Sequence, residues 1–356
     1  MRFIARHRKF FNVTIAIVCI LLFSFFAIRT ITSGGHEVRT QVYTGIAMGT
    51  AIKKTIYAED ITVSDRVDKM IDETLQELEN QISVRKNNSE ISKLNSSYVT
   101  GGTNKLSDNV LQCLEVEIQV WRETEGAFSP CIYPITSLWG IEEGLAEIPD
   151  EALLQERILS SDANNIEVVE DGIILNQENM AIDLGAVGKG LACDMVKEQL
   201  MQTEIRGAVV SIGGSILAYG DKGDGKDWHI GIQDPRNQTG EVLGIIDVDG
   251  DVVVSTSGDY EKYFELDGKR YHHIFDPITG YPADNGLISV SVVSDSGLLS
   301  DALSTACFVL GLEEGMNYVQ EKGVEAVFVT SDMNVYVTKG LKKKFRLKSD
   351  EYTLVK

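Results

Sequence analysis

Apolar residues recur at helical spacing in several parts of the chain. After Ser64, which we expect to cap a helix, Val67, Ile71, Leu75 and Leu78 fall on one helical face. Similar spacing predicts further helices over residues 110–121, opened by Ser107, over residues 188–201 and over residues 298–310. Each of these helices needs a packing partner for its apolar face.

Segments rich in Val and Ile, with alternating or continuous apolar character, predict strands. These strands are expected at residues 166–176, 207–218, 228–234, 242–257, 287–293 and 325–338. Most of them follow one another in groups and do not alternate with helices. This order favours an α+β fold over a doubly wound α/β fold.

The N-terminal region has a different pattern. Residues 10–28 carry no charge, nearly reach the roughly 20 residues of a membrane-spanning helix, and follow a basic segment at residues 6–9. We predict a cytoplasmic segment (1–9), a single transmembrane signal anchor (10–28) in the cytoplasmic membrane, a polar tether (29–40) and an extracytoplasmic domain (41–356). A cleaved signal peptide is the alternative, but residues 27–29 offer no small-x-small cleavage site.

Charge is distributed unevenly along the 356 residues. The net charge is −20, but residues 1–34 carry five basic side chains and no acidic one, so the rest carries −25. A body this acidic repels phosphate backbones, and we expect no nucleic-acid partner. Its four cysteines, at positions 113, 131, 193 and 307, show no zinc spacing, and we expect buried thiols, with a disulfide as the alternative.

Two glycine-rich segments could contact phosphate. Residues 220–226 match GxxxxGK, but Asp227 stands where a magnesium-binding Ser or Thr would follow, so we expect a polar hairpin loop between strands. Residues 183–190 (DLGAVGKG) follow a predicted strand at 180–184 and precede a predicted helix. The first amides of this predicted helix could face an anion, and Lys189 would add a positive charge. The alternative is a glycine-rich turn with only a packing role.

Two further patterns could carry chemistry. Asp301 and Thr305 lie four residues apart, on one face of a predicted helix, and their oxygens would suit Mg²⁺; an ordinary helix N-terminus is the alternative. His272 and His273 lie in an extended segment, so at most one of them should enter a given site as a proton acceptor. The alternative here is a polar turn closed by Asp276 and Gly280.

The order of the motifs is more specific than any one of them. The chain carries MGT (48–50), DLGAVGKG (183–190), IGG (212–214), STSGDY (255–260), HHIFDPITG (272–280) and DALST (301–305). In this order, over residues 44–340, they resemble the ApbE family of FAD:protein FMN transferases. The resemblance implies a single α+β domain of mixed, largely antiparallel sheets with packed helices.

The resemblance also implies a reaction and a site. The FMN half of FAD would pass to a Ser or Thr hydroxyl of an acceptor flavoprotein through a phosphoester bond, with Mg²⁺ bound and AMP released. Asp301, Thr305 and the carbonyl of Ala186 match the family's metal ligands, and His273, not His272, matches its base. The expected flavin-nucleotide contacts are Met48, Arg85, Ala127, Phe128, Ser129, Asp183, Lys189 and Phe275.

Three positions depart from the family pattern. Ser129 replaces an aspartate, Arg85 stands where many members have an aromatic residue near the flavin, and Ser211 replaces a frequent asparagine. These departures concern ring and adenosine recognition and leave the expected metal and phosphate residues in place. Two other functions stay open: an FAD pyrophosphatase giving FMN and AMP, and a membrane-tethered flavin-binding protein without catalysis. The resemblance points to an acceptor among secreted flavoproteins or subunits of membrane redox ion pumps.

Overall fold

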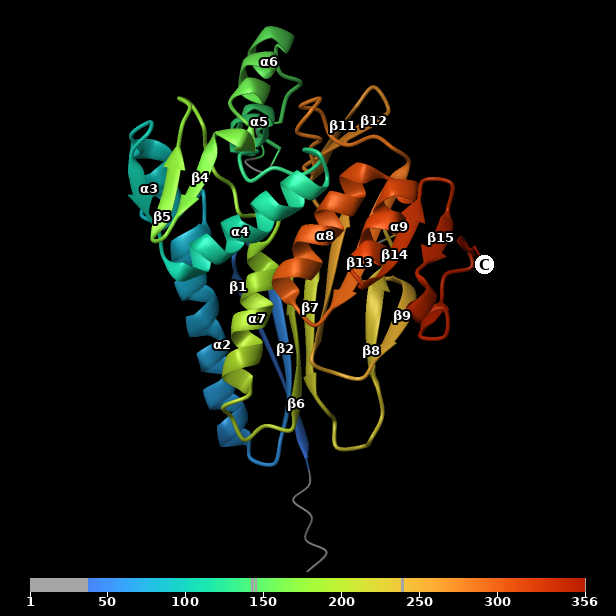
Figure 1. Cartoon of the computed structure of the whole chain (residues 1–356). Coiled ribbons are helices and arrows are strands. Elements are labelled where there is room, and N and C mark those ends of the chain that lie inside the picture. The colour runs from blue at the N-terminus through green and yellow to red at the C-terminus, as the bar shows by residue number, and fades with distance from the viewer. Residues whose placement is uncertain (1–37, 142–143, 145, 238–239, 356) are drawn as a thin grey trace, which may run out of the picture.

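A nine-stranded sheet is the centre of the fold (Figure 1). The computed structural model describes residues 38–141, 144, 146–237 and 240–355. Strand order is β1-β2-β6-β7-β10-β13-β14-β15-β17, and neighbours pair antiparallel except β15 with β17. The strands are β1 (Arg39–Ala47), β2 (Thr50–Ala58), β6 (Gly207–Ile212), β7 (Ser215–Gly220), β10 (Val252–Gly258), β13 (Leu287–Ser294), β14 (Glu325–Thr330), β15 (Asn334–Val337) and β17 (Thr353–Leu354).

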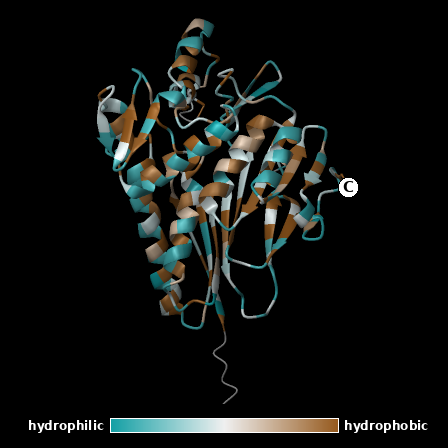
Figure 2. Cartoon of the chain, viewed as in Figure 1, coloured by the Kyte–Doolittle hydropathy of each residue, from teal (hydrophilic) through white to brown (hydrophobic). Residues whose placement is uncertain are grey.

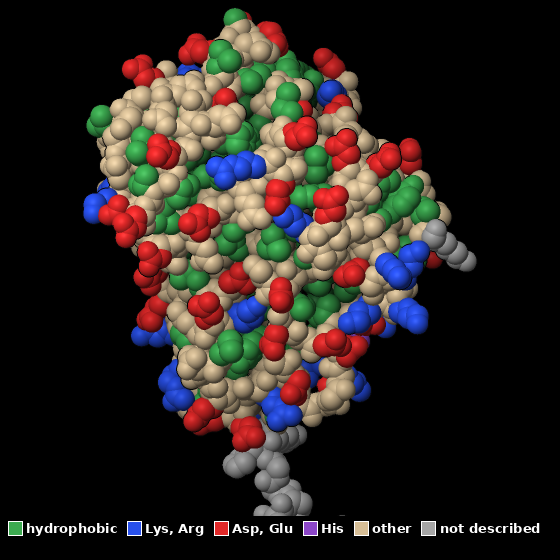
Figure 3. Space-filling view, viewed as in Figure 1, with side chains coloured by type: hydrophobic (Ala, Val, Ile, Leu, Met, Phe, Trp, Pro, Cys, Tyr) green, Lys and Arg blue, Asp and Glu red, His purple; other side chains and the backbone are tan. Residues whose placement is uncertain are grey.

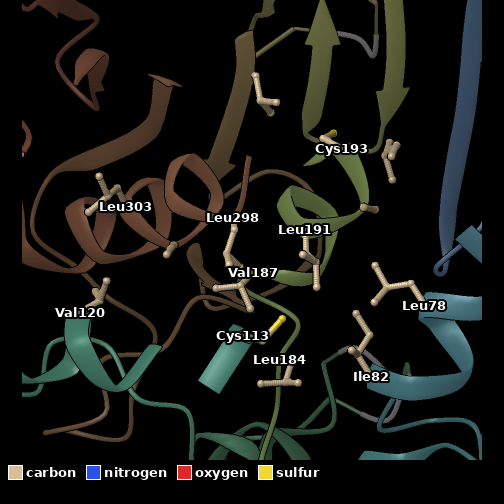
Figure 4. Close-up of a cluster of buried hydrophobic side chains, with 14 of the residues drawn as sticks. Leu78, Ile82, Cys113, Val120, Leu184, Val187, Leu191, Cys193, Leu298 and Leu303 are labelled. Atoms are coloured by element: carbon tan, nitrogen blue, oxygen red, sulfur yellow. The ribbon is translucent and has the colours of Figure 1, made fainter. Parts of the chain in front are cut away.

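Helices cover one face of this sheet. They are α2 (Ile61–Ile82), α4 (Asp108–Glu123), α7 (Gly188–Leu200), α8 (Gly297–Leu310) and α9 (Leu312–Glu321). Figure 4 shows apolar side chains of α2, α4, α7 and α8 converging around Leu184 and Val187, which precede α7. Apolar residues lie on the packed sides of these elements in Figure 2, as expected for amphipathic helices on a sheet.

A second, smaller sheet covers the opposite face. Its strands are β8 (Trp228–Gln233), β9 (Val242–Val248) and β16 (Phe345–Leu347), in the order β16-β9-β8. Successive side chains of the large sheet point to opposite layers: Val253 packs among the helices, whereas Val254 packs with Ile230 and Ile246 of the small sheet. Strands β10, β13 and β14 of the large sheet are therefore buried on both faces, which explains their nearly continuous buried positions.

Smaller elements lie at one end of these layers, at the top of Figure 1. They are α3 (Glu90–Ser97), α5 (Tyr133–Trp139), α6 (Glu151–Leu159), the sheet of β3 (Thr103–Lys105), β5 (Gly172–Leu175) and β4 (Ile166–Val169), and the hairpin of β11 (Tyr263–Leu266) and β12 (Lys269–His272). Short 3₁₀ turns occur at Ala163–Asn165 and Lys339–Leu341. Trp139 packs against Phe275 and donates a hydrogen bond of 2.8 Å to the Gly280 carbonyl, which anchors the loop after β12.

The α+β fold is confirmed, but four predicted strands are each two strands. Residues 166–176, 207–218, 242–257 and 325–338 contain β4 with β5, β6 with β7, β9 with β10, and β14 with β15. Turns divide them at residues 170–171, at Gly213 (φ 56°), at Gly250 (φ 121°) and Asp251 (φ 55°), and at Met333 (φ 60°). Each turn is only a short polar or glycine break in the sequence, and each predicted segment ran through one of these breaks.

The predicted helices over 110–121, 188–201 and 298–310 are confirmed as α4, α7 and α8. The predicted cap at Ser64 is wrong: Ser64 is buried inside α2, and Asp60 caps the helix by accepting a hydrogen bond of 2.9 Å from the Thr62 amide. The strand predicted at 180–184 is also wrong. The backbone of this segment forms hydrogen bonds with the side chains of Asn95 and Tyr98 and pairs with no neighbouring strand.

The predicted membrane anchor lies outside the described residues. The same holds for the cytoplasmic segment at 1–9 and for most of the tether at 29–40, while β1 begins at Arg39, inside that tether. Within the part of the chain that the structure describes, no helix has the length and apolar character needed to cross a membrane.

Two smaller expectations concern a loop and the cysteines. Residues 221–227, which hold most of the GxxxxGK segment, form a loop between two strands as expected, but β7 and β8 belong to different sheets, so the loop does not close a hairpin. Cys113, Cys131, Cys193 and Cys307 are all buried free thiols, and burial raises the pKa of each of them.

Two glycines let α7 and α8 cross at backbone distance. A Cβ placed on Gly190 would lie 2.1 Å from the Gly297 carbonyl oxygen, and one on Gly297 would lie 2.3 Å from the Gly190 carbonyl oxygen. Asp194 of α7 adds a polar clamp, because its carboxylate accepts the amides of Gly297 and Leu298 at 2.7 and 2.9 Å. The start of α8 is therefore fixed to α7 by close backbone contact and by a cap from the neighbouring helix.

One acid lies in the middle of this core. Glu117 of α4 is fully buried, and neither carboxyl oxygen has a hydrogen-bond partner. Burial raises its pKa well above the ordinary value, and the negative charges of Asp183 and Asp301 add to the shift. The neutral form of Glu117 is therefore favoured in the folded protein.

The crossing gives a first prediction. Gly190→Ala should lower the free energy of unfolding by about 2 kcal/mol or more, because the new methyl group overlaps backbone atoms that cannot rotate away. Chemical denaturation of the full-length chain measures this change. Gly45→Ala is the matched control, since no atom lies within 4 Å of its added Cβ. Equal stability of the Gly190 variant and the wild type would contradict the close crossing.

Glu117 gives a second prediction. In the unfolded chain this acid ionises near pH 4.5, but in the folded chain it stays protonated to higher pH, so it lowers stability increasingly as pH rises above 4.5. Glu117→Gln should therefore become more stable relative to wild type by about 1.4 kcal/mol per pH unit, up to the raised pKa. Glu115→Gln, exposed on the same helix, is the control. A stability difference that does not change between pH 5 and 8 would contradict a buried neutral acid.

Candidate functional site

Asp301 is the buried centre of the candidate site. It lies in the second turn of α8, where the contact between Gly190 and Gly297 brings α8 against the start of α7. Its Oδ2 accepts the Gly190 amide at 2.8 Å, and its Oδ1 accepts the Ser215 hydroxyl at 3.3 Å. Burial raises the pKa of Asp301, while Lys189 and these donors oppose the shift.

Thr305 lies one turn after Asp301, on the same side of α8. Its hydroxyl lies 3.0 Å from the hydroxyl of Ser257, at the end of β10. Thr305 is only partly buried, whereas Asp301 is 2% exposed. The Asp301 carboxylate is therefore the more buried of the two groups, and the Thr305 hydroxyl lies nearer the surface on the same helical face, as the four-residue spacing predicts.

Lys189, in the first turn of α7, lies beside Asp301, and Ala186 stands in the turn directly before this helix. Lys189 Nζ lies 3.8 Å from Asp301 Oδ2 and donates to the Gly185 carbonyl at 3.2 Å. The negative charge of Asp301 raises the pKa of Lys189, which stays charged. Asp183 closes the turn by accepting the Gly185 amide at 2.9 Å. The predicted phosphate turn and the predicted metal residues are thus neighbours, although 111 residues separate Gly190 from Asp301.

The two histidines have different partners. His272 is buried, with Nε2 2.9 Å from the Ala283 carbonyl and Nδ1 accepting the Ile274 amide, so both of its ring nitrogens are engaged. His273 Nδ1 lies 3.2 Å from the Lys262 carbonyl. Because a carbonyl accepts only, Nδ1 carries the proton and Nε2 is the proton acceptor. Only His273 can therefore act as a base in this arrangement.

Burial and nearby cations keep His273 neutral. Burial, followed by the positive charge of Lys262, lowers the pKa of His273 to about 3. The neutral form is the one that can take a proton from a hydroxyl.

A group of cations surrounds this base. Arg85 and Lys189 lower the pKa of Lys262 in addition to its burial, while Glu261 and Asp183 oppose that shift. These five side chains are thus close enough to interact electrostatically although they come from three separate segments. Three cations at one place would compensate the negative charges of a diphosphate, which the acidic body as a whole would repel.

Glu261 and Lys262 are the residues that the sequence analysis missed. They directly follow the STSGDY segment and precede β11, so their position after a recognised motif was the available signal. The backbone of Lys262 also holds His273, whose amide donates to the Lys262 carbonyl at 3.1 Å. Lys262 and His273 directly flank the hairpin of β11 and β12, so the pairing of these strands brings the cation to the base. The spacing of residues along the sequence does not specify this pairing.

The remaining residues predicted to contact the flavin nucleotide differ in burial and in their neighbours. Met48 adopts φ 51° in the turn between β1 and β2, and its Cε would lie 3.7 Å from a Cβ placed on Gly188 at the start of α7. Phe128 and Phe275 are 4% and 5% exposed and belong to apolar clusters, so their rings serve packing.

Ala127 and Ser129 are also almost fully buried. The Ser129 hydroxyl donates to the Ser161 carbonyl at 2.9 Å and accepts the Cys131 amide at 3.1 Å. Since these side chains have internal roles, residues 127–129 could contact a nucleotide mainly through their backbone.

The donor set of Asp301, Thr305 and the Ala186 carbonyl suits a hard divalent cation. Among the described residues no three His, Cys, Asp or Glu side chains form a metal-binding group. One carboxylate, one hydroxyl and one carbonyl do not form such a group, yet they are oxygen ligands of the kind Mg²⁺ prefers, with phosphate oxygens and water completing its shell. The deeply buried Asp301 carboxylate, paired with Lys189, fits this role.

Surface charge agrees with local compensation. On the face that Figure 3 shows, Lys and Arg side chains stand among Asp and Glu side chains. An anionic ligand would therefore bind through the local cations of the site and the amides at the start of α7.

Comparison with known proteins identifies the family. The ApbE family model matches residues 48–328. Proteins named FAD:protein FMN transferase from Treponema pallidum (strain Nichols) and Klebsiella pneumoniae (strain 342) are 32% and 30% identical to this chain. The alignments cover 90% and 89% of this chain and 93% and 98% of the relatives.

Solved structures agree with this assignment. The apo form of the Pseudomonas stutzeri flavinyl transferase ApbE has a TM-score of 0.76 at 27% identity, covering 86% of this chain and 97% of that one. The ApbE protein of Thermotoga maritima has a TM-score of 0.79 at 26% identity, covering 86% and 100%. The fold, the order of the motifs and both sets of relatives lead to one conclusion: the chain belongs to the ApbE family.

Proposed function

We propose that this chain transfers the FMN half of FAD to a Ser or Thr hydroxyl of an acceptor flavoprotein, in a Mg²⁺-dependent reaction that releases AMP. Flavin transfer itself follows from membership of the ApbE family and the names of the relatives. The finer statement is carried by one observation: His273, the cations Lys189 and Lys262, and the buried Asp301 come together from distant segments.

The proposed transfer is a displacement at phosphorus. The acceptor oxygen forms a bond to the FMN-side phosphorus, the bond from that phosphorus to the bridging oxygen breaks, and AMP leaves with that oxygen. His273 Nε2 takes the hydroxyl proton, because Nδ1 is held by the Lys262 carbonyl. Reactions of this kind depend mainly on position and charge neutralisation.

The cations and the metal ligands have complementary roles. Lys189, Lys262 and Arg85 would bind and orient the diphosphate. Asp301, Thr305 and the Ala186 carbonyl would hold Mg²⁺, which supplies charge neutralisation at the phosphate oxygens when bound. Asp301 is almost fully buried and is the only carboxylate of this ligand set. Its loss would therefore remove the one negatively charged ligand of the cation.

Location is part of the proposal. The uncharged run at residues 10–28 supports a single-pass anchor in the cytoplasmic membrane with the flavin transferase domain outside. Secreted flavoproteins or extracytoplasmic flavin subunits of redox ion pumps would be accessible from that side.

The deciding experiment uses the full-length chain with FAD and Mg²⁺, with and without a candidate acceptor. We expect the intact mass of the acceptor to increase by one FMN, with AMP released in equal amount and only when acceptor is present. Rapid AMP release without acceptor would instead favour an FAD pyrophosphatase. FAD binding without AMP release under either condition would favour a non-catalytic flavin-binding protein.

Asp301→Asn should lower the transfer rate at least about 100-fold, because metal charge stabilisation contributes several kcal/mol. The measurement is the initial rate of acceptor flavinylation at several Mg²⁺ concentrations. Asp249→Asn, an exposed aspartate that pairs with Lys344, is the matched control. Magnesium-dependent turnover near the wild-type rate in the Asp301 variant would contradict this metal site.

His273→Ala should lower the rate about 10²- to 10⁴-fold, less than removal of all metal, because a general base contributes that much. With its pKa lowered to about 3, His273 stays neutral at ordinary pH, so its titration should cause no loss of rate between pH 8 and 5. His229→Ala, an exposed histidine beside Asp247, is the control. A wild-type rate in the His273 variant would exclude it as the base.

A further inference from the structure

Buried hydroxyl groups line the contact between β10 and α8. The Ser257 hydroxyl lies 2.8 Å from that of Ser304 and 3.0 Å from that of Thr305. Ser304 in turn donates to the backbone carbonyl of Asp301 at 2.9 Å. These contacts form one continuous chain from Thr305 at the site to the backbone of α8.

The direction of the protons in this chain is determined by its end. Each serine or threonine hydroxyl has one proton to donate, and a carbonyl only accepts. Because Ser304 gives its proton to the Asp301 carbonyl, its oxygen must accept from Ser257. Ser257 has then used its own proton and must accept from Thr305. The Thr305 proton therefore points to Ser257, and its lone pairs are turned away from that contact.

We propose that Ser257 is a positioning residue that fixes the Thr305 hydroxyl with its lone pairs toward the proposed cation. This inference rests on the proposed function, because it assumes that Thr305 binds Mg²⁺. A hydroxyl can serve as a metal ligand only through a lone pair, so the orientation of its proton decides whether Thr305 attracts or repels the ion. The residue that accepts this proton therefore contributes to cation binding by orienting the ligand.

A parallel chain holds Asp301. Ser215 donates to Asp301 Oδ1 at 3.3 Å. The hydroxyl of Ser255, two residues before Ser257, lies 3.1 Å from that of Ser215 and 2.8 Å from that of Ser300. Ser255 and Ser257 point to the same side of β10 because side chains alternate along a strand. Strand β10 thus contributes one serine to the hydroxyl network beside Asp301 and one to the network beside Thr305.

Thr256 shows the contrast. It lies between the two serines, and its hydroxyl bonds Ser291 of β13 at 2.8 Å. This pair is a buried hydroxyl contact of the same kind and length, but it contacts neither Asp301 nor Thr305. Ser291 therefore offers a matched control for the loss of one buried hydroxyl.

The test is isothermal titration of the full-length chain with Mg²⁺ in the presence of FAD and without acceptor. Ser257→Ala should raise the dissociation constant of Mg²⁺ about 10- to 100-fold, the usual cost of losing a partner that orients a metal ligand. With acceptor added, the Mg²⁺ concentration for half-maximal transfer should rise equally. The rate at saturating Mg²⁺ and the unfolding temperature without metal should stay near those of the wild type.

Ser291→Ala should leave the Mg²⁺ dissociation constant within about twofold of wild type. Wild-type Mg²⁺ affinity in the Ser257 variant, or an equal loss of affinity in the Ser291 variant, would overturn the positioning role. A wild-type chain that transfers FMN without binding Mg²⁺ would instead show that the proposed metal dependence is wrong. The two failures are therefore distinguishable.

Discussion

The close crossing of α7 and α8 is the constraint on which the site depends. Two glycines without side chains let the backbones touch, and the Asp194 carboxylate caps the neighbouring helix at the same place. This contact brings the Asp301 carboxylate to the Gly190 amide, so an acid from the C-terminal half meets the turn that carries Lys189. A side chain at either glycine would separate the two helices and, with them, the oxygen ligands from the phosphate-binding turn.

The fold could be predicted in class but not in detail. The helices around Leu75, Leu191 and Leu303 were predictable because each has an apolar face at helical spacing. Most strand boundaries were not, because turns such as that at Gly213 are only two or three residues long and the apolar segments on both sides were joined into one predicted strand. The segment before Leu184 misled for a related reason: its apolar residues are buried, but side chains satisfy its backbone where a strand would otherwise pair.

The site divides in a similar way. Order along the chain placed Asp301, Lys189 and His273 in one functional group, and the structure brings them together. The order of the motifs could not show that Lys262 and Glu261 belong to the site, because the pairing of β11 with β12 creates the contact between Lys262 and His273. The ligand contacts expected at Phe128 and Phe275 stay predictions, and both residues are almost fully buried and belong to apolar clusters. Spacing gives the face of one helix or strand, but contacts between distant segments depend on how the elements pack.

Charge explains why the site needs so many fixed dipoles. A dinucleotide diphosphate approaches a body with net charge −25, so long-range attraction cannot retain it, and Asp301 and Asp183 add negative charge at the site itself. Binding must then come from groups whose direction is set before the ligand arrives: the first amides of α7, the ammonium of Lys189 and hydroxyls whose protons already have acceptors. Ser257 of β10 meets this need without adding charge, because a buried hydroxyl with a defined acceptor gives orientation at little desolvation cost compared with another ion pair.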